Sequence, residues 1–177
     1  RLGSDISKQY LCLHELPILV HTLNVFEQSD MIQEIVLVAP KGDLAFVREQ
    51  VAEKYGVTKV SAIVAGGRER QDSVRNALDA VTGPCDVVIV HDGVRPFVTQ
   101  EMIADVVKAA VEDGAASIGV PAKDTIKETN GENIVAATLP RQNLWLTQTP
   151  QAFQYDLLCR AYAKAAEDGY YGTDDAS

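Results

Sequence analysis

The chain has 177 residues, of which 46% are hydrophobic and 23% are charged, and this composition excludes an intrinsically disordered chain. Its longest apolar runs, 35–39 and 87–90, are too short to cross a bilayer, and no secretory signal opens the sequence, so we expect a soluble intracellular protein. Sixteen basic against twenty-five acidic residues give a net charge of −9, which disfavours nucleic acid or an anionic membrane as a partner.

Strand-like and helix-like segments alternate along the chain. In order, we expect a helix over 17–28, a strand over 35–39, a helix over 44–54, a strand over 59–64, a helix over 72–81, a strand over 86–91, a helix over 100–113, a strand over 117–120 and a helix over 155–168. Thr99 is a suitable N-cap for the fourth helix, and Gly114 is a suitable stop. Continuous apolar strands that alternate with helices predict an α/β fold with a mostly parallel sheet covered on both faces. We expect one domain over 1–177.

One segment departs from this alternation. Residues 125–128 and 133–138 are strand-like, and Asn130-Gly131 between them is a strong hairpin signal. A hairpin inserted into an α/β sheet either pairs at an edge or projects outward, and a projecting hairpin needs a partner to cover it.

Two glycines lie where the second strand meets a helix. Gly66 and Gly67 are followed by Ser73 within the segment G-G-R-E-R-Q-D-S-V. Free backbone N–H groups at such a turn contact anions or nucleotides, and a tight strand–helix turn without a ligand is the alternative. The segment is neither GxGxxG nor a P-loop.

The third strand ends directly in charged residues. Asp92, Gly93 and Arg95 follow it in V-H-D-G-V-R-P-F, and ligands in open α/β sheets bind outside the carboxyl ends of strands. Asp92 is suited to a divalent metal or a sugar hydroxyl, and Arg95 to a phosphate. An internal Asp–Arg pair that only fixes the loop is the alternative. We expect His91 to pack and hydrogen-bond rather than to bind metal, and the three cysteines and three histidines lack metal-site spacing.

Six ordered segments together resemble one enzyme family. They are R-L-G-x3-S-K-Q-Y, G-G-R-E-R-Q-D-S-V, V-H-D-G-V-R-P-F, K-D-T-I-K, R-Q-N-L-W-x2-Q-T-P-Q-A-F and T-D-D-A-S, and they span essentially the whole chain. In this order they resemble the 2-C-methyl-D-erythritol 4-phosphate cytidylyltransferase family of the non-mevalonate isoprenoid pathway. The resemblance implies a Rossmann-like nucleotidyltransferase fold with an inserted β-hairpin arm. It also implies that a first strand with a Gly-rich loop before Arg1, and further strands after Ser177, are lacking from these residues.

The resemblance also assigns roles to individual residues. The two cations that stabilise the triphosphate in the transition state would be Arg1 and Lys8. The nucleotide-binding residues would be Gly66, Gly67, Ser73, Asp92 and Gly93. The residues that hold the acceptor, 2-C-methyl-D-erythritol 4-phosphate, would be Arg95, Thr125, Arg141, Thr149 and Thr173.

The cofactor and the assembly follow from the same resemblance. The cofactor would be Mg²⁺ or another divalent cation held mainly by the phosphates of CTP, with Asp92 as the one candidate side chain. The β-arm over 123–141 would form a homodimer in which Arg141 reaches the partner's site, in the bacterial cytoplasm.

Three other functions compete with this one. Ribitol-5-phosphate cytidylyltransferase has the same chemistry but another acceptor, and the segments with Trp145 and 173–177 resemble it less. A non-catalytic nucleotide-binding module is disfavoured because Arg1, Lys8, Asp92 and Arg95 occur together. A dinucleotide-dependent oxidoreductase is disfavoured by the lack of GxGxxG.

Overall fold

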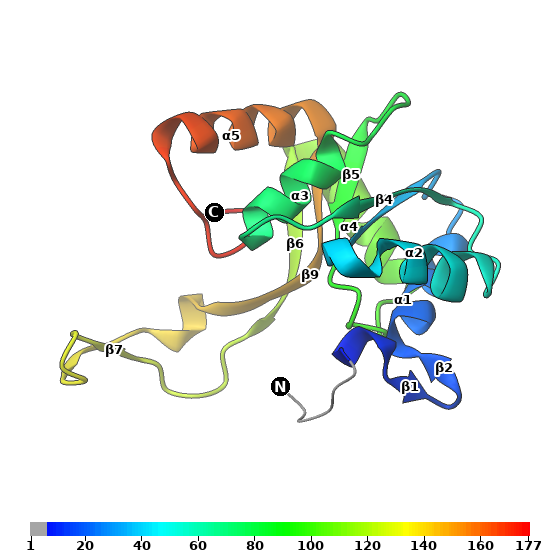
Figure 1. The fold of residues 1–177 in the computed structure, drawn as a ribbon. Helices are drawn as coiled ribbons and strands as arrows, with labels where there is room; N and C mark the ends of the chain where they lie inside the picture. The colour runs from blue at the N-terminus through cyan, green and yellow to red at the C-terminus, as the bar shows by residue number, and fades with distance from the viewer. Residues whose placement is uncertain (1–6) are drawn as a thin grey trace.

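Two strand systems form the frame of the molecule in the computed structural model, which describes residues 7–177 (Figure 1). Strands β3 (Ile35–Ala39) and β4 (Val60–Ala65) pair in parallel. A second sheet has the order β5-β9-β6, formed by Val87–Val90, Trp145–Gln154 and Ala115–Pro121. The mixed α/β class that the sequence predicts is confirmed.

The helices lie close to where the sequence pattern places them. They are α1 (Ile18–Glu27), α2 (Leu44–Val47), which continues as the π-helical turn η3 (Arg48–Glu53), α3 (Arg70–Leu78), α4 (Gln100–Asp113) and α5 (Tyr155–Asp168). Shorter elements are the 3-10 turns η1 (Lys8–Tyr10), η2 (Lys41–Asp43) and η4 (Arg141–Asn143) and the small strands β1 (Cys12–Leu13) and β2 (Leu16–Pro17). In the described residues 7–177, no helix is both long and apolar enough to cross a membrane.

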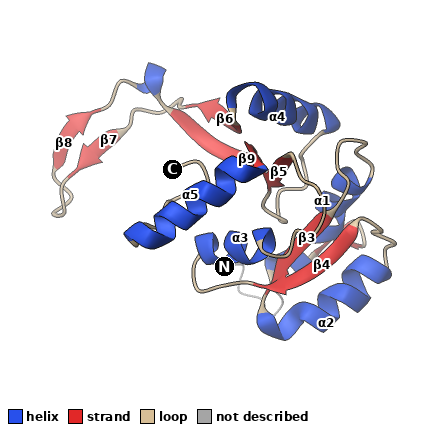
Figure 2. Ribbon diagram, turned by 90° about the horizontal axis from the view of Figure 1, so that it is seen from above, coloured by secondary structure: helices blue, strands red, loops and turns tan. Residues whose placement is uncertain are grey.

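Helices cover both faces of the three-stranded sheet. Val88 and Val90 of β5 pack against the core of α3 and α5, whereas Val87 and Ile89 pack against α4. Successive side chains of a strand point to opposite faces, so a strand buried on both faces needs a continuous apolar run. Figure 2 shows α4 on one side of this sheet and α3 and α5 on the other.

The strand β9 has no counterpart among the elements expected from the sequence, and it runs antiparallel to both β5 and β6. Its sequence, WLTQTPQAFQ, is polar and contains Pro150, which normally argues against a central strand. The ladder accommodates the proline at an irregularity, since Ser117 pairs with Gln151 and Gly119 pairs with Thr147. Pro150 therefore lies where β6 makes no regular pairing.

The expected hairpin is present as β7 (Lys127–Thr129) and β8 (Val135–Thr138), which pair in antiparallel fashion. Its connection is longer than a two-residue Asn-Gly turn. The Asn130 side chain closes it by accepting hydrogen bonds from the backbone N–H groups of Glu132 and Ile134, both at 3.0 Å. In both ribbon views the hairpin lies apart from the two sheets (Figures 1 and 2).

The start of α4 gives a test of the helix cap. The Thr99 hydroxyl accepts a hydrogen bond from the backbone N–H of Met102 at 3.2 Å. We expect Thr99→Ala to lower the free energy of unfolding by about 1 kcal/mol, because an amide in the first turn loses its acceptor. Urea denaturation of the full-length protein measures this, with Thr99→Ser as the control that keeps the oxygen. Equal loss in both variants would show that the hydroxyl is not what stabilises the helix.

Candidate functional site

The turn that joins β4 to α3 is closed by a serine. Ser73 Oγ accepts a hydrogen bond from the Gly67 backbone N–H at 3.0 Å and donates to the Glu69 carbonyl at 3.0 Å. A Cβ on Gly67 would lie 2.2 Å from Cβ of Asp72, so only glycine fits there without a shift of the helix. Gly66, Gly67 and Ser73 line a hollow of about 480 Å³ together with residues 38–41. A side chain on either glycine would meet Ser73 or Asp72, so the two glycines are needed for the tight turn that forms one wall of this hollow.

Asp92 lies just beyond the end of β5, between two guanidinium groups. Its Oδ1 accepts from Arg70 at 2.9 Å and its Oδ2 accepts from Arg95 at 2.8 Å. Partial burial favours the protonated carboxyl, but the hydrogen bond from Arg95 and the charges of Arg70 and Arg95 outweigh it and lower the pKa of Asp92 below its ordinary value. Asp92 is therefore an anion at neutral pH. The Asp–Arg pair considered as an alternative is present, within a larger cluster that includes Arg70.

Strand β9 brings further polar groups to Asp92. The backbone N–H of Asp92 donates to Thr149 Oγ1 at 3.1 Å, and Arg95 donates to the side-chain oxygen of Gln148. The sequence assigned Asp92 to the nucleotide and Thr149 to the acceptor, and the two residues are in direct contact.

The backbone after Asp92 packs against α1. A Cβ on Gly93 would lie 2.8 Å from Cδ1 of Leu19, and the Gly93 carbonyl accepts from the Thr22 hydroxyl at 2.9 Å. His91 packs as expected, with its ring 5.1 Å from that of Phe26 and its Nε2 3.1 Å from the Arg95 carbonyl. Burial lowers the pKa of His91, so the imidazole is neutral at physiological pH.

The remaining expected site residues are more dispersed. Lys8 lies exposed on η1, and Arg1 lies outside the described residues. Thr125 is exposed on the approach to β7. Arg141 is exposed on η4 and donates to the Lys123 carbonyl at 2.6 Å, which holds it at the base of the hairpin. Thr173 is exposed beyond α5, in a segment tied to Arg70 through Asp175.

The described side chains do not form a metal centre. Within residues 7–177 no group of three or more His, Cys, Asp or Glu side chains could hold an ion. Both oxygens of Asp92 accept from guanidinium groups, and two cations beside a carboxylate disfavour a third. Asp92 in this arrangement does not fit the metal-ligand role considered from the sequence.

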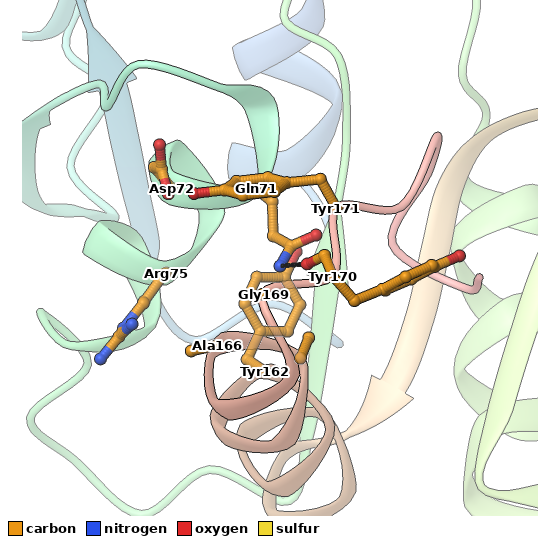
Figure 3. A pocket seen from close by; sticks show the side chains of 9 residues that line it. Gln71, Asp72, Arg75, Tyr162, Ala166, Gly169, Tyr170 and Tyr171 are labelled. Atoms are coloured by element: carbon orange, nitrogen blue, oxygen red, sulfur yellow. Dashed lines mark hydrogen bonds between the residues drawn. The ribbon is translucent and has the colours of Figure 1, made fainter.

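A second hollow, of about 230 Å³, lies between α3 and α5 (Figure 3). Gln71, Arg75 and Tyr162 are among the side chains that line it. It holds none of the site residues expected from the sequence within the described part of the chain. The hollow beside Gly66 and Gly67 is therefore the better candidate for the nucleotide.

Arg70 is the residue of this cluster that the sequence reasoning did not single out. It is the first residue of α3, where the positive end of the helix dipole disfavours a cation. That position is unfavourable by itself, and no local pattern in the sequence shows which acidic groups the guanidinium contacts.

Comparison with known proteins agrees with this geometry. The family model of 2-C-methyl-D-erythritol 4-phosphate cytidylyltransferase matches residues 1–177. A protein of that name from Syntrophus aciditrophicus is 50% identical over 177 residues, which cover all of this chain and 76% of that protein. A bifunctional enzyme from Desulforudis audaxviator is 48% identical over the whole chain, which covers 45% of that protein.

Solved structures give the same result. The 4-diphosphocytidyl-2C-methyl-D-erythritol synthase of Anaerococcus prevotii matches with a TM-score of 0.85 and 30% identity, over 98% of this chain and 75% of that one. The 2-C-methyl-D-erythritol 4-phosphate cytidylyltransferase of Thermus thermophilus matches with a TM-score of 0.76 and 34% identity, over 96% and 76% of the two chains. The Rossmann-like nucleotidyltransferase fold expected from the sequence is thereby confirmed. The chain belongs to the 2-C-methyl-D-erythritol 4-phosphate cytidylyltransferase family.

Proposed function

We propose that the residues around Asp92 and the Gly66-Gly67 turn form the site at which CMP is transferred from CTP to 2-C-methyl-D-erythritol 4-phosphate. The products are pyrophosphate and 4-diphosphocytidyl-2-C-methyl-D-erythritol, an intermediate of isoprenoid precursor synthesis. The observation that carries this proposal is the contact between the two halves of the site: Asp92, on the nucleotide side, donates its backbone N–H to Thr149, on the acceptor side. Family membership favours this reaction over the ribitol phosphate enzyme and over a non-catalytic module.

The chemistry needs charge and orientation rather than a base. The nucleophile is a phosphate monoester whose second pKa is about 6, so it is largely dianionic at neutral pH. Its oxygen attacks the α-phosphorus of CTP, and the bond from that phosphorus to the pyrophosphate oxygen breaks. The barrier lies in bringing two polyanions together and in stabilising the charge at the α-phosphate. His91 packs against Phe26 and its Nε2 bonds the Arg95 carbonyl, which supports a reaction in which this imidazole is not the base.

We propose separate groups of residues for the nucleotide, the acceptor and the triphosphate. For the cytosine we propose Gly66, Gly67 and Ser73, which line the hollow, and for the ribose we propose Asp92 with Gly93. On the acceptor side we propose Arg95, Thr125, Arg141, Thr149 and Thr173. For the triphosphate we propose Lys8, whose exposed position on η1 leaves its ammonium accessible, together with Arg1.

We also propose that the reaction requires Mg²⁺ carried by CTP. Mg²⁺ in nucleotide sites commonly keeps several waters and is bound by substrate phosphates with few protein ligands. The described side chains, which form no metal cage, are compatible with an ion that enters on its nucleotide. Such an ion would supply compensating charge to the triphosphate.

The arm is proposed as a dimer contact. Four large apolar side chains on or beside the hairpin have 51 to 62% of their surface exposed, namely Ile134, Val135, Trp145 and Leu146. Large apolar side chains that gather on a projecting element are typical of a surface that another chain covers. A homodimer formed through this arm would place Arg141 near a second site. We also propose a cytoplasmic location, because the reaction uses CTP.

The first prediction from the proposed function concerns the acceptor. We expect the full-length protein to release pyrophosphate from CTP with methylerythritol phosphate, and to lose this activity when the divalent cation is chelated and regain it when Mg²⁺ is added. A coupled pyrophosphate assay measures both. Turnover with ribitol 5-phosphate alone would assign the sister activity, and turnover with neither acceptor would favour a binding module.

The second prediction concerns Lys8. We expect Lys8→Ala to lower kcat by at least about a hundredfold and to change the KM for CTP less, because the ammonium faces charge that develops in the transition state. Steady-state kinetics with CTP varied at saturating acceptor measure the split. Lys108→Ala, which removes an exposed cation on α4 that lines neither hollow, is the matched control. A raised KM with kcat intact would assign Lys8 to ground-state binding instead.

The third prediction concerns Arg141 and the arm. If each site takes Lys8 from one chain and Arg141 from the other, mixed dimers of Lys8→Ala and Arg141→Ala contain one intact and one doubly defective site. With random pairing, about a quarter of the wild-type activity should return on co-expression. Activity that stays at the level of the separate variants would place Arg141 in the site of its own chain.

A further inference from the structure

Arg70 joins two carboxylates that belong to different parts of the chain. Its NH1 donates to Asp92 Oδ1 at 2.9 Å, and its NH2 donates to Asp175 Oδ2. The planar guanidinium can hold both carboxylates at once, which a lysine ammonium does less well because it lacks a rigid fork of donors. These two contacts outweigh the unfavourable position of a cation at the start of α3.

Asp175 belongs to the C-terminal segment, which we define as residues 172–177, and this segment is anchored in the core. The Asp175 side chain is only 2% exposed, and its Oδ1 accepts from the Tyr162 hydroxyl at 2.7 Å. The buried amide of Gln151 donates to Asp174 Oδ2 at 3.1 Å and accepts from the Asp175 backbone N–H at 3.3 Å. A carboxylate as buried as that of Asp175 needs a cationic partner, and Arg70 is the cation that contacts it.

A second contact from α3 reaches the start of the same segment. Gln71 donates to the Tyr170 carbonyl at 3.0 Å and accepts from the Gly172 backbone N–H at 3.0 Å. Figure 3 shows the Gln71 side chain directed at the Tyr170 backbone. Thr173 therefore lies exposed between two anchored neighbours, Gly172 and Asp174.

We propose that Arg70 is a positioning residue that sets the nucleotide side and the acceptor side of the site together, by holding Asp92 with one edge of its guanidinium and the C-terminal segment with the other. The inference rests on the proposed function, because it takes Asp92 as a nucleotide contact and Thr173 as an acceptor contact. Arg70 itself touches neither substrate in this account. It acts through Asp92 and Asp175.

Two variants separate the two edges of the guanidinium. Arg70→Gln removes both contacts, and we expect the KM for CTP and the KM for methylerythritol phosphate each to rise by about tenfold or more. Asp175→Asn removes the negative charge that faces Arg70 and leaves the Asp92 contact in place, so the KM for the acceptor should rise while the KM for CTP stays within about twofold. Arg75→Gln, on the exposed side of the same helix, is the matched control and should change neither.

The combination of the two variants tests the coupling. If Asp175 acts through Arg70, the double variant should have the same acceptor KM as Arg70→Gln alone. Direct CTP binding, measured by calorimetry without acceptor, should weaken in Arg70→Gln and not in Asp175→Asn. Arg70→Lys, which keeps the charge, should restore part of the loss and serves if the glutamine variant does not fold.

Each result decides the matter. Folded Arg70 variants with both KM values within about twofold of wild type would overturn the positioning role, as would additive effects in the double variant. A lowered unfolding midpoint with unchanged KM values would leave Arg70 a purely structural residue. If the wild-type protein itself fails to turn over CTP with methylerythritol phosphate, the proposed function fails instead, and the calorimetric comparison still tests whether Arg70 supports CTP binding through Asp92.

Discussion

The pairing of β9 between β5 and β6 is the constraint on which the site depends. In the described sheet β5 and β6 each pair with β9 and not with one another. The same strand that completes the sheet also carries Thr149 and Gln148 to Asp92 and Arg95, and Gln151 to the C-terminal segment. Gln148 and Thr149 lie in the irregular stretch before Gln151, where β9 has no regular partner on β6, whereas Gln151 is paired with both Val90 and Ser117.

The charges of the site are arranged as an alternating chain. Each charged group contacts the next one, in the order Arg95, Asp92, Arg70 and Asp175. Tyr162 ends the series with a hydrogen bond to Asp175. Burial and then the hydrogen bond to Asp175 raise the pKa of Tyr162, so its hydroxyl keeps its proton and remains a donor. The two arginines balance the two carboxylates, so this series of ion pairs carries no net charge and fixes the geometry of the site rather than attracting a phosphorylated ligand by itself.

The hairpin and the core differ in how they treat apolar side chains. The sheets and their helices bury apolar side chains between them, whereas the hairpin leaves Ile134 and Val135 exposed and lies apart in both ribbon views. Its loop is closed by local hydrogen bonds to the Asn130 side chain. A projecting element with exposed apolar side chains is suited to contact with a second molecule, and this is the physical ground for the proposed dimer.

The sequence by itself determined the elements whose information is local. The apolar run of β5, the Thr99 cap, the Gly114 stop and the hairpin around Asn130 were all predicted, because each rests on periodicity or on a short hydrogen bond. The family was also evident, since six ordered segments carry it, and so were Asp92 and the glycine turn as candidate site residues.

Tertiary structure alone decided three things. It made a central strand of 145–154, whose polar sequence and proline oppose that assignment until β5 and β6 are present to pair with it. It brought an arginine to each oxygen of Asp92. Arg95 is close to Asp92 along the chain, but Arg70 is not, so its contact could not be predicted from the order of residues. It brought Asp175 beside Arg70, across more than half the chain. Contacts between residues this far apart form only when the sheet and helices have packed, so no local pattern in the sequence encodes them.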